Sequence, residues 1–236
     1  EKATYRLEKD LLGNMEINQD CYHGIQTQRA VNNFKLSAKK LTDYPELINA
    51  LAYVKSASAT ANLQQNLLDN VKASAIIKAA EYVHTGQFNQ SFAIDMIQGG
   101  AGTSSNMNIN EVLANIGLEL LGHEKGEYQY LHPNTDVNMS QSTNDVYPSA
   151  VRLSVLLNQE SLLTAVEQLV ASFTHKSNEF SGILKLARTQ LQDAVPMTLG
   201  QEFKSFASTL REDIKLIKNT GKLLTEINLG GTAVGT

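Results

Sequence analysis

The sequence is poor in cysteine and has no long hydrophobic run. Cys21 is the only cysteine among 236 residues, so the chain cannot form an internal disulfide. Chains without disulfides are typical of reducing compartments. Residues 1–5 carry no apolar core of a secretory signal peptide, and no run of about 18 apolar residues could cross a membrane. We therefore expect a cytoplasmic protein with no membrane partner.

The chain also lacks an excess of positive charge and the common metal-binding motifs. Lys and Arg number 20 against 24 Asp and Glu, which gives a formal net charge of −4, whereas nucleic-acid-binding domains usually present a basic face. No two histidines have the i, i+4 spacing of a helical zinc motif, and one cysteine cannot complete a Cys-rich site. We expect no nucleic-acid partner and no metal. The histidines are His23, His84, His123, His132 and His175.

Helical periodicity is what the sequence contains in abundance. Hydrophobic residues make up 42% of the chain, enough for a core, and most recur with the spacing of amphipathic helices. Pro45 suits the first turn of a helix, because its missing N–H needs no partner there. Strand signals are weak. We expect residues 1–44 to be irregular with short elements, residues 92–97 to form a short strand or buried turn, and helices over about 45–61, 71–83, 110–121, 144–179 and 199–228.

The segment from about Asn144 to Glu179 is the strongest of these signals. It contains no glycine, and its only proline, Pro148, falls where we expect the first turn. A helix of roughly 35 residues is about 50 Å long, which is typical of a helix in a large bundle. Thr198 and Gln201 have the spacing of a capping box that starts the next long helix.

These patterns predict an all-α fold with two parts. We expect residues 1–140 to form a mainly helical N-terminal domain, and residues 141–236 to form part of a central helix bundle. The two long helices each carry an apolar stripe that must be covered. We therefore expect them to associate with further helices of the same chain or of other chains.

Three polar segments between the predicted helices are the candidate binding elements. All are rich in hydroxyl and amide groups and none has a net positive charge, which suits a small anion. The first lacks the lysine of a P-loop and the third glycine of a dinucleotide motif. The purely structural alternatives are a tight interhelix turn for the first segment, a helix N-cap for the second and a polar connection for the third. A phosphate-binding nest is a further functional alternative for the first segment. The segments are 99–108, 141–145 and 188–194.

The second segment directly precedes the long helix. Ser142, Thr143 and Asn144 are all residue types that cap helix N-termini. A helix N-terminus also carries partial positive charge and free N–H groups. A carboxylate bound there gains charge-assisted hydrogen bonds, each worth roughly 1.5–3 kcal/mol.

With these segments in their order along the chain, the sequence resembles the aspartase/fumarase superfamily, and within it the aspartase branch. The resemblance runs over essentially the whole chain. Its matching blocks are 6–13, 99–115, 126–131, 141–148, 188–203 and 230–233. It implies the helical fold of that superfamily, of which this chain would hold the N-terminal domain and the first long helices of the central bundle.

The resemblance implies a reaction and a set of binding residues. The reaction is the reversible elimination of ammonia from L-aspartate to give fumarate, without a metal or an organic cofactor. Loss of the C3 proton places a second negative charge on the β-carboxylate, and preorganised donors stabilise that charge as it develops. The implied roles are a grip on the β-carboxylate by Thr103, Ser142 and Thr143, and orientation of the amino group by Asn144 and Thr189 with Gln190 beside them.

Gln190 marks a departure within the superfamily. Fumarases, and some aspartases, carry histidine at this position. A neutral amide cannot supply a proton to departing hydroxide, whereas ammonia leaves with less help from an acid. Gln190 therefore favours an ammonia-lyase over the alternative, a fumarate hydratase.

The signature loop of the superfamily, Gly-Ser-Ser-x-Met-Pro-x-Lys-x-Asn-Pro, occurs nowhere in these residues. In the family this loop supplies the serine that takes the C3 proton, and each site is built from three subunits of a homotetramer. The expectation is a chain that ends before the loop, holds no catalytic residue of its own and is inactive alone. The alternative from another class is a non-catalytic helical assembly module.

Overall fold

The computed structural model describes residues 4–99 and 102–235, which form two compact units. The first comprises Glu1–Ser154 with Ile227–Thr236, and the second comprises Val155–Glu226. The expected all-α class is confirmed, because helices dominate and the only sheets of the described residues are two antiparallel pairs of strands. One long helix, α5, spans Thr143–Glu179 and passes from the first unit into the second. The expected division at residue 140 stays a prediction.

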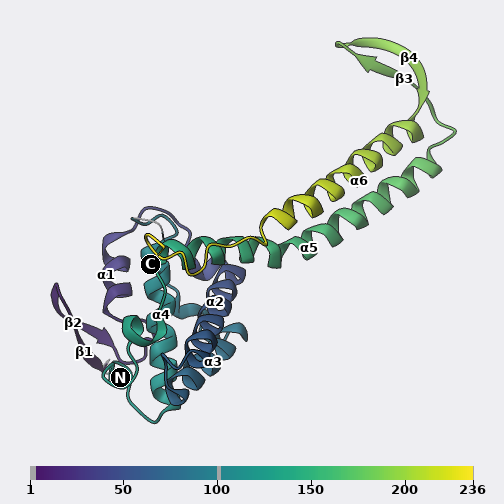
Figure 1. Ribbon diagram of the computed structural model, residues 1–236. Helices are drawn as coiled ribbons and strands as arrows, with labels where there is room; N and C mark the ends of the chain where they lie inside the picture. The colour runs from purple at the N-terminus through teal and green to yellow at the C-terminus, as the bar shows by residue number, and fades with distance from the viewer. Residues whose placement is uncertain (1–3, 100–101, 236) are drawn as a thin grey trace. The chain divides into compact units, whose positions relative to one another are not determined.

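Three helices form the core of the first unit and lie side by side (Figure 1). They are α2 (Pro45–Gln64), α3 (Asn70–His84) and α4 (Thr103–Leu120). Ile48, Ile76 and Leu113 contribute one fully buried side chain from each helix, and Phe92 and Leu131 close the core from the connecting segments. Burial of each such side chain contributes about 1.5–3 kcal/mol.

Helix α4 begins at Thr103 and not near Asn110, where the apolar periodicity placed its start. Gly102 immediately before it has φ +84°, a left-handed conformation that glycine adopts without strain. The first turns of α4 bury Ser105, Asn106 and Asn108. A search for apolar periodicity misses such a turn, since its buried face is made of polar side chains.

Strands occur where none was expected. Residues 5–18 form an antiparallel hairpin of β1 (Tyr5–Asp10) and β2 (Gly13–Asn18). These are two of the short elements expected within residues 1–44, but the sequence did not identify them as strands. Helix α1 (Ile25–Asn33) follows. Residues 92–97 make no strand but only an isolated bridge between Lys40 and Asp95, so they form the buried-turn alternative. Short helical turns cover Leu41–Asp43, Asn89–Ser91 and Pro133–Val137.

Pro148 lies inside α5 and not in its first turn. A proline cannot donate to the carbonyl four residues earlier, which is that of Asn144. The side chain of Asn228 donates to this carbonyl at 3.1 Å instead. The segment after the last helix therefore satisfies a backbone group that the proline leaves unpaired.

In the second unit, α5 continues beside α6 (Leu199–Leu223). The predicted capping box is confirmed, because the hydroxyl of Thr198 accepts from Gln201 N and the Gln201 side chain accepts from Thr198 N. Helix α6 ends before the expected Asn228. Its aromatic contacts include Phe203 against Phe173 and Phe180, with ring centroids 5.8 and 5.3 Å apart.

Residues 184–198 form a second hairpin, β3 (Leu184–Thr189) with β4 (Gln192–Thr198). The plain polar connection considered for residues 188–194 is therefore wrong. Gln190 and Leu191 form its two-residue turn with φ +51° and +63°, which is the pattern of a type I′ turn. Both residues are exposed.

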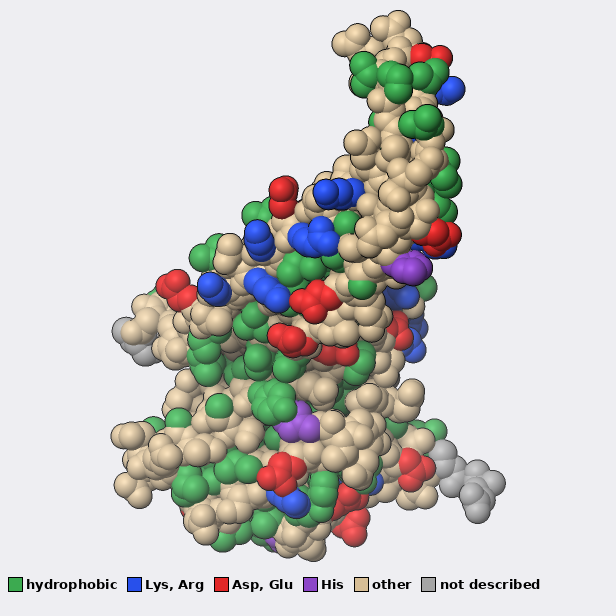
Figure 2. Space-filling model, turned by 90° about the vertical axis from the view of Figure 1, so that its right-hand side faces the viewer, with side chains coloured by type: hydrophobic (Ala, Val, Ile, Leu, Met, Phe, Trp, Pro, Cys, Tyr) green, Lys and Arg blue, Asp and Glu red, His purple; other side chains and the backbone are tan. Residues whose placement is uncertain are grey.

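On the face shown in Figure 2, basic and acidic side chains both occur, and several basic side chains lie near one another with acidic ones around them. Among the described residues, no helix combines the length and apolarity needed to cross a membrane.

Candidate functional site

The N-termini of α4 and α5 meet in the first unit. A Cβ placed on Gly102 would collide with the ring of Tyr147 in the first turns of α5. One turn into α4, the amide Nδ2 of Asn106 lies 3.2 Å from the hydroxyl oxygen of Thr143, the first residue of α5. Glycine at position 102 thus allows the two helix ends to approach closely. Gly100 and Ala101, also part of the first predicted segment, lie outside the described residues.

Four of the six predicted site residues belong to the two helix starts that meet at this junction. Thr103 is the first residue of α4 and is exposed. Ser142 and Thr143 are half-buried and Asn144 is exposed. Thr189 and Gln190 lie at the turn of the β3–β4 hairpin and belong to the second unit.

The start of α5 is held by a carboxylate. Asp145 is fully buried, and its Oδ1 accepts from Ser142 N at 3.0 Å. Its Oδ2 accepts from Gly230 N at 3.1 Å and from Thr232 N at 2.9 Å. Asp145 thereby ties the predicted binding segment to the segment after α6. The side chain of Ser142 also accepts from Asn144 N at 3.2 Å, the ordinary contact of a capping residue.

A buried lysine lies behind this segment. Lys55 of α2 is fully buried, and its Nζ donates to Asn138 Oδ1 at 2.8 Å and to Gln141 Oε1 at 2.9 Å. Burial lowers the pKa of Lys55 well below its usual value, and the charge of Asp145 opposes that shift. Asn106 and Asn110 of α4 donate to the same Asn138 oxygen, at 3.1 and 3.2 Å.

Sequence reasoning missed Lys55 and Asn138, and it included Asn106 only as a member of the segment 99–108, without a role of its own. The signal that could have found Lys55 is its position beside Leu51 and Val54 on the apolar face of a predicted helix. Lysine is almost never fully buried without partners, so a lysine on that face predicts polar groups in the core. The asparagines give no such signal, because amide side chains are common at any surface.

Chemically, the junction offers uncharged donors at two helix N-termini. The hydroxyls of Thr103, Ser142 and Thr143 accompany backbone N–H groups that a helix start leaves without an intrahelical partner. Helix N-termini favour negative charge, so this arrangement suits a carboxylate. In the part of the chain that the structure describes, no group of three His, Cys, Asp or Glu side chains is placed to hold a metal ion.

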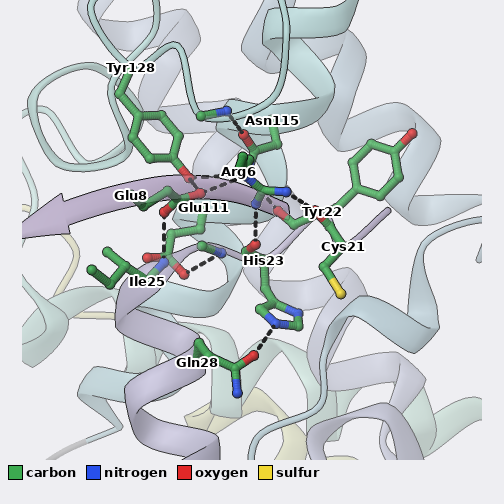
Figure 3. Close-up of polar contacts among 12 residues, drawn as sticks. Arg6, Glu8, Cys21, Tyr22, His23, Ile25, Gln28, Glu111, Asn115 and Tyr128 are labelled. Atoms are coloured by element: carbon green, nitrogen blue, oxygen red, sulfur yellow. Dashed lines mark hydrogen bonds and ion pairs between the residues drawn. The ribbon is translucent and has the colours of Figure 1, made fainter. Parts of the chain in front are cut away.

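A second polar cluster holds the start of α1 in the first unit (Figure 3). The carboxylate of Glu111 in α4 accepts from the backbone N–H groups of Gly24, Gln26 and Thr27 at 2.8–3.0 Å. Glu8 of β1 accepts from Ile25 N at 2.8 Å.

The side chains of Arg6 and Tyr128 complete this cluster. Arg6 Nε donates to Glu8 Oε1 at 2.8 Å, and the Tyr128 hydroxyl donates to the same oxygen at 3.1 Å. Both carboxylate oxygens of Glu8 and of Glu111 accept hydrogen bonds from this chain. This favours a structural role for the cluster over ligand binding.

Glu111 should make the stability of the first unit depend on pH. Burial raises the pKa of Glu111 from 4.5 to about 7, although hydrogen bonds from Thr27 oppose the shift. Between these values the unfolded chain has released a proton that the folded chain retains, so the contribution of Glu111 falls as pH rises. The loss over this window is on the order of 3 kcal/mol.

This pH dependence can be tested by measuring the free energy of unfolding in urea at several pH values, for the wild type and for Glu111→Gln. The free energy of unfolding of the wild type, relative to the variant, should decrease from pH 4.5 to about pH 7. Glu124→Gln is the matched control, because Glu124 is exposed, and it should leave the pH dependence unchanged. A wild-type advantage that grows with pH would contradict the assignment.

Comparison with known protein families places the chain among lyases. A family model described as lyase matches residues 13–236. The aspartate ammonia-lyase of Pseudomonas aeruginosa is 58% identical over 235 residues, which cover 99% of this chain and 50% of that protein. The aspartate ammonia-lyase of Escherichia coli is 52% identical over 232 residues, or 98% of this chain and 48% of that protein. The chain thus spans about half the length of the curated relatives it matches.

Solved structures agree with these relatives. A protein of Brucella melitensis titled fumarate lyase:delta crystallin superposes with a TM-score of 0.96 at 55% identity, over 99% of this chain and 51% of that chain. A class II fumarase of Schistosoma mansoni superposes with a TM-score of 0.91 at 34% identity, over 99% of this chain and 49% of that chain.

Proposed function

Because this chain belongs to the lyase family, and with it to the aspartase/fumarase superfamily, we propose that it supplies part of a site for the reversible deamination of L-aspartate to fumarate and ammonia. The observation that carries this proposal is the junction of α4 and α5, where uncharged hydroxyl donors gather at two helix N-termini. The names of the relatives at 52% and 58% identity support the choice of substrate.

The chemistry explains why such donors are useful. A base removes the C3 proton, and the electron pair moves into the β-carboxylate, which then carries a second negative charge. The pair returns to form the C2–C3 double bond as ammonia leaves from C2. Thr103, Ser142 and Thr143 bind the β-carboxylate, and their hydrogen bonds strengthen as its charge grows. No cofactor is needed for this step.

Asn144, Thr189 and Gln190 orient the amino group. Thr189 and Gln190 come from a tight hairpin turn, whose two-residue type I′ geometry holds the backbone of Gln190 in one conformation. Gln190 has no acidic proton to give, which is compatible with ammonia as the leaving group and unfavourable for hydroxide.

The base is not among these residues, since the signature loop does not occur in them. A site therefore also needs a polypeptide that carries this loop, and we expect the 236 residues alone to release no fumarate. A homo-oligomer, most simply a tetramer, is the proposed assembly. Supporting it, the second unit has an apolar groove of about 640 Å³ between α5 and α6. We propose a cytoplasmic location.

The test is an assay of the full-length gene product with L-aspartate, in which fumarate is followed by its ultraviolet absorbance. We expect fumarate release and, in the reverse direction, aspartate from fumarate and ammonia. Malate formed from fumarate instead would favour the hydratase alternative. A folded, assembled gene product that makes neither would contradict the proposal and favour the assembly module.

A further inference from the structure

The most informative group that the proposed function leaves unexplained is the side chain of Asn106. It is 2% exposed, at the end of α4 that meets α5. Its Nδ2 donates to Thr143 Oγ1 at 3.2 Å and to Asn138 Oδ1 at 3.1 Å. Its own Oδ1 is buried and receives no hydrogen bond from the described residues.

The orientation of these amides follows from chemistry. A backbone carbonyl only accepts, so the Asn138 atom that faces the carbonyl of Gln141 at 3.2 Å must be Nδ2. The opposite atom of Asn138 is then Oδ1, an acceptor. The Asn106 atom that faces this oxygen must be a donor, Nδ2, and the same atom faces Thr143. Asn106 therefore presents an N–H, and not a carbonyl oxygen, to the hydroxyl of Thr143.

This contact decides what the hydroxyl of Thr143 can do. A hydroxyl has one hydrogen and two lone pairs, and the N–H of Asn106 occupies one lone pair. The hydrogen of Thr143 must then point away from Asn106, and it makes no hydrogen bond to another described residue. We propose that Asn106 is a positioning residue that keeps the Thr143 hydroxyl as a donor toward the bound carboxylate. This inference rests on the proposed function.

Asn110 provides a matched control on the same helix. It is fully buried, it donates to the same Asn138 oxygen at 3.2 Å, and its Oδ1 is likewise buried without a partner among the described residues. The hydrogen bonds of the Asn110 side chain go to Asn138 and Met107, and not to Thr143. In either Asn→Leu variant, Asn138 Oδ1 keeps two donors, Lys55 and the remaining asparagine. The two variants thus differ in the contact with Thr143.

In the full-length protein we expect a loss of kcat in Asn106→Leu and not in Asn110→Leu. Asn106→Leu should lower kcat for L-aspartate about tenfold, the scale of one hydrogen bond, with a smaller change in KM. The reason is that the contact matters most when charge develops on the carboxylate. Asn110→Leu should keep kcat within about twofold of wild type. Both variants should show similar shifts of Tm.

A double-mutant cycle tests whether Asn106 acts through Thr143. In a Thr143→Val background, Asn106→Leu should cause no further loss of kcat/KM, because the hydroxyl that it orients is gone. Asn110→Leu in the same Thr143→Val background shows how much kcat/KM changes when a neighbouring buried asparagine is replaced. If Asn106→Leu fails to fold, the smaller Asn106→Ala replaces it throughout the cycle.

The outcomes separate the inference from the proposed function. The inference is overturned if Asn106→Leu and Asn110→Leu have equal kcat values, or if Asn106→Leu lowers kcat/KM as much without the Thr143 hydroxyl as with it. A wild-type protein without lyase activity overturns the proposed function and the inference together. If the wild type is active and Asn106→Leu does not change kcat, the inference alone is overturned.

Discussion

Replacing Thr143 by valine is expected to lower kcat/KM for L-aspartate by about one to two orders of magnitude in the full-length protein. Valine has nearly the shape of threonine but no hydroxyl. The one hydrogen bond that the hydroxyl donates to the β-carboxylate in the transition state would be lost, at a cost of ~1.5–3 kcal/mol. The measurement is steady-state fumarate release, together with Tm of the same preparation.

Thr143→Ser is the matched control for this experiment. Serine keeps the hydroxyl and loses only a methyl group, so most of the activity should remain. Folding should change little in either variant, since it is Ser142 that accepts from Asn144 N and Asp145 that accepts from Ser142 N. A collapse of Tm in Thr143→Val, with normal activity per folded molecule, would show that Thr143 is a cap and not a ligand.

The long helices were predictable because their signals are local. Helix α5 begins within one residue of the predicted start and ends at Glu179, and Thr198 and Gln201 identify the start of α6. The hairpins were not predictable by the same means. In the turn of β3–β4, Gln190 and Leu191 adopt positive φ although neither is a glycine or asparagine, so the residue preferences of type I′ turns give no signal there.

The binding residues were predicted from resemblance and chemistry, whereas the residues behind them were not. Ser142 and Thr143 lie next to a recognisable helix start, which any reading of the sequence can locate. Lys55, Asn106 and Asn138 are brought together by the packing of α2 against α4 and the segment before α5. Contacts over 83 and 32 residues of sequence separation depend on tertiary structure, and no single-sequence periodicity encodes them.

Asp145→Ala should be the most damaging polar substitution for the stability of the first unit. It removes the acceptor of three backbone N–H groups, those of Ser142, Gly230 and Thr232. It also removes the negative charge that favours the protonated form of the buried Lys55. A buried charge that loses its partner typically costs about 3–5 kcal/mol, and we expect a loss of this size in the free energy of unfolding by urea.

The contribution of the charge can be separated from that of the hydrogen bonds by a second substitution. Lys55→Met removes the buried ammonium while retaining an unbranched side chain of similar length. In the double variant the lysine is no longer left without its counter-charge, so the combined loss should be smaller than the sum of the two single losses. Asp145→Asn, which keeps one acceptor oxygen, should fall between wild type and Asp145→Ala. Strictly additive losses would mean that Asp145 stabilises the start of α5 through its hydrogen bonds alone, and that Lys55 is held by the amide oxygens of Asn138 and Gln141 without help from the charge of Asp145.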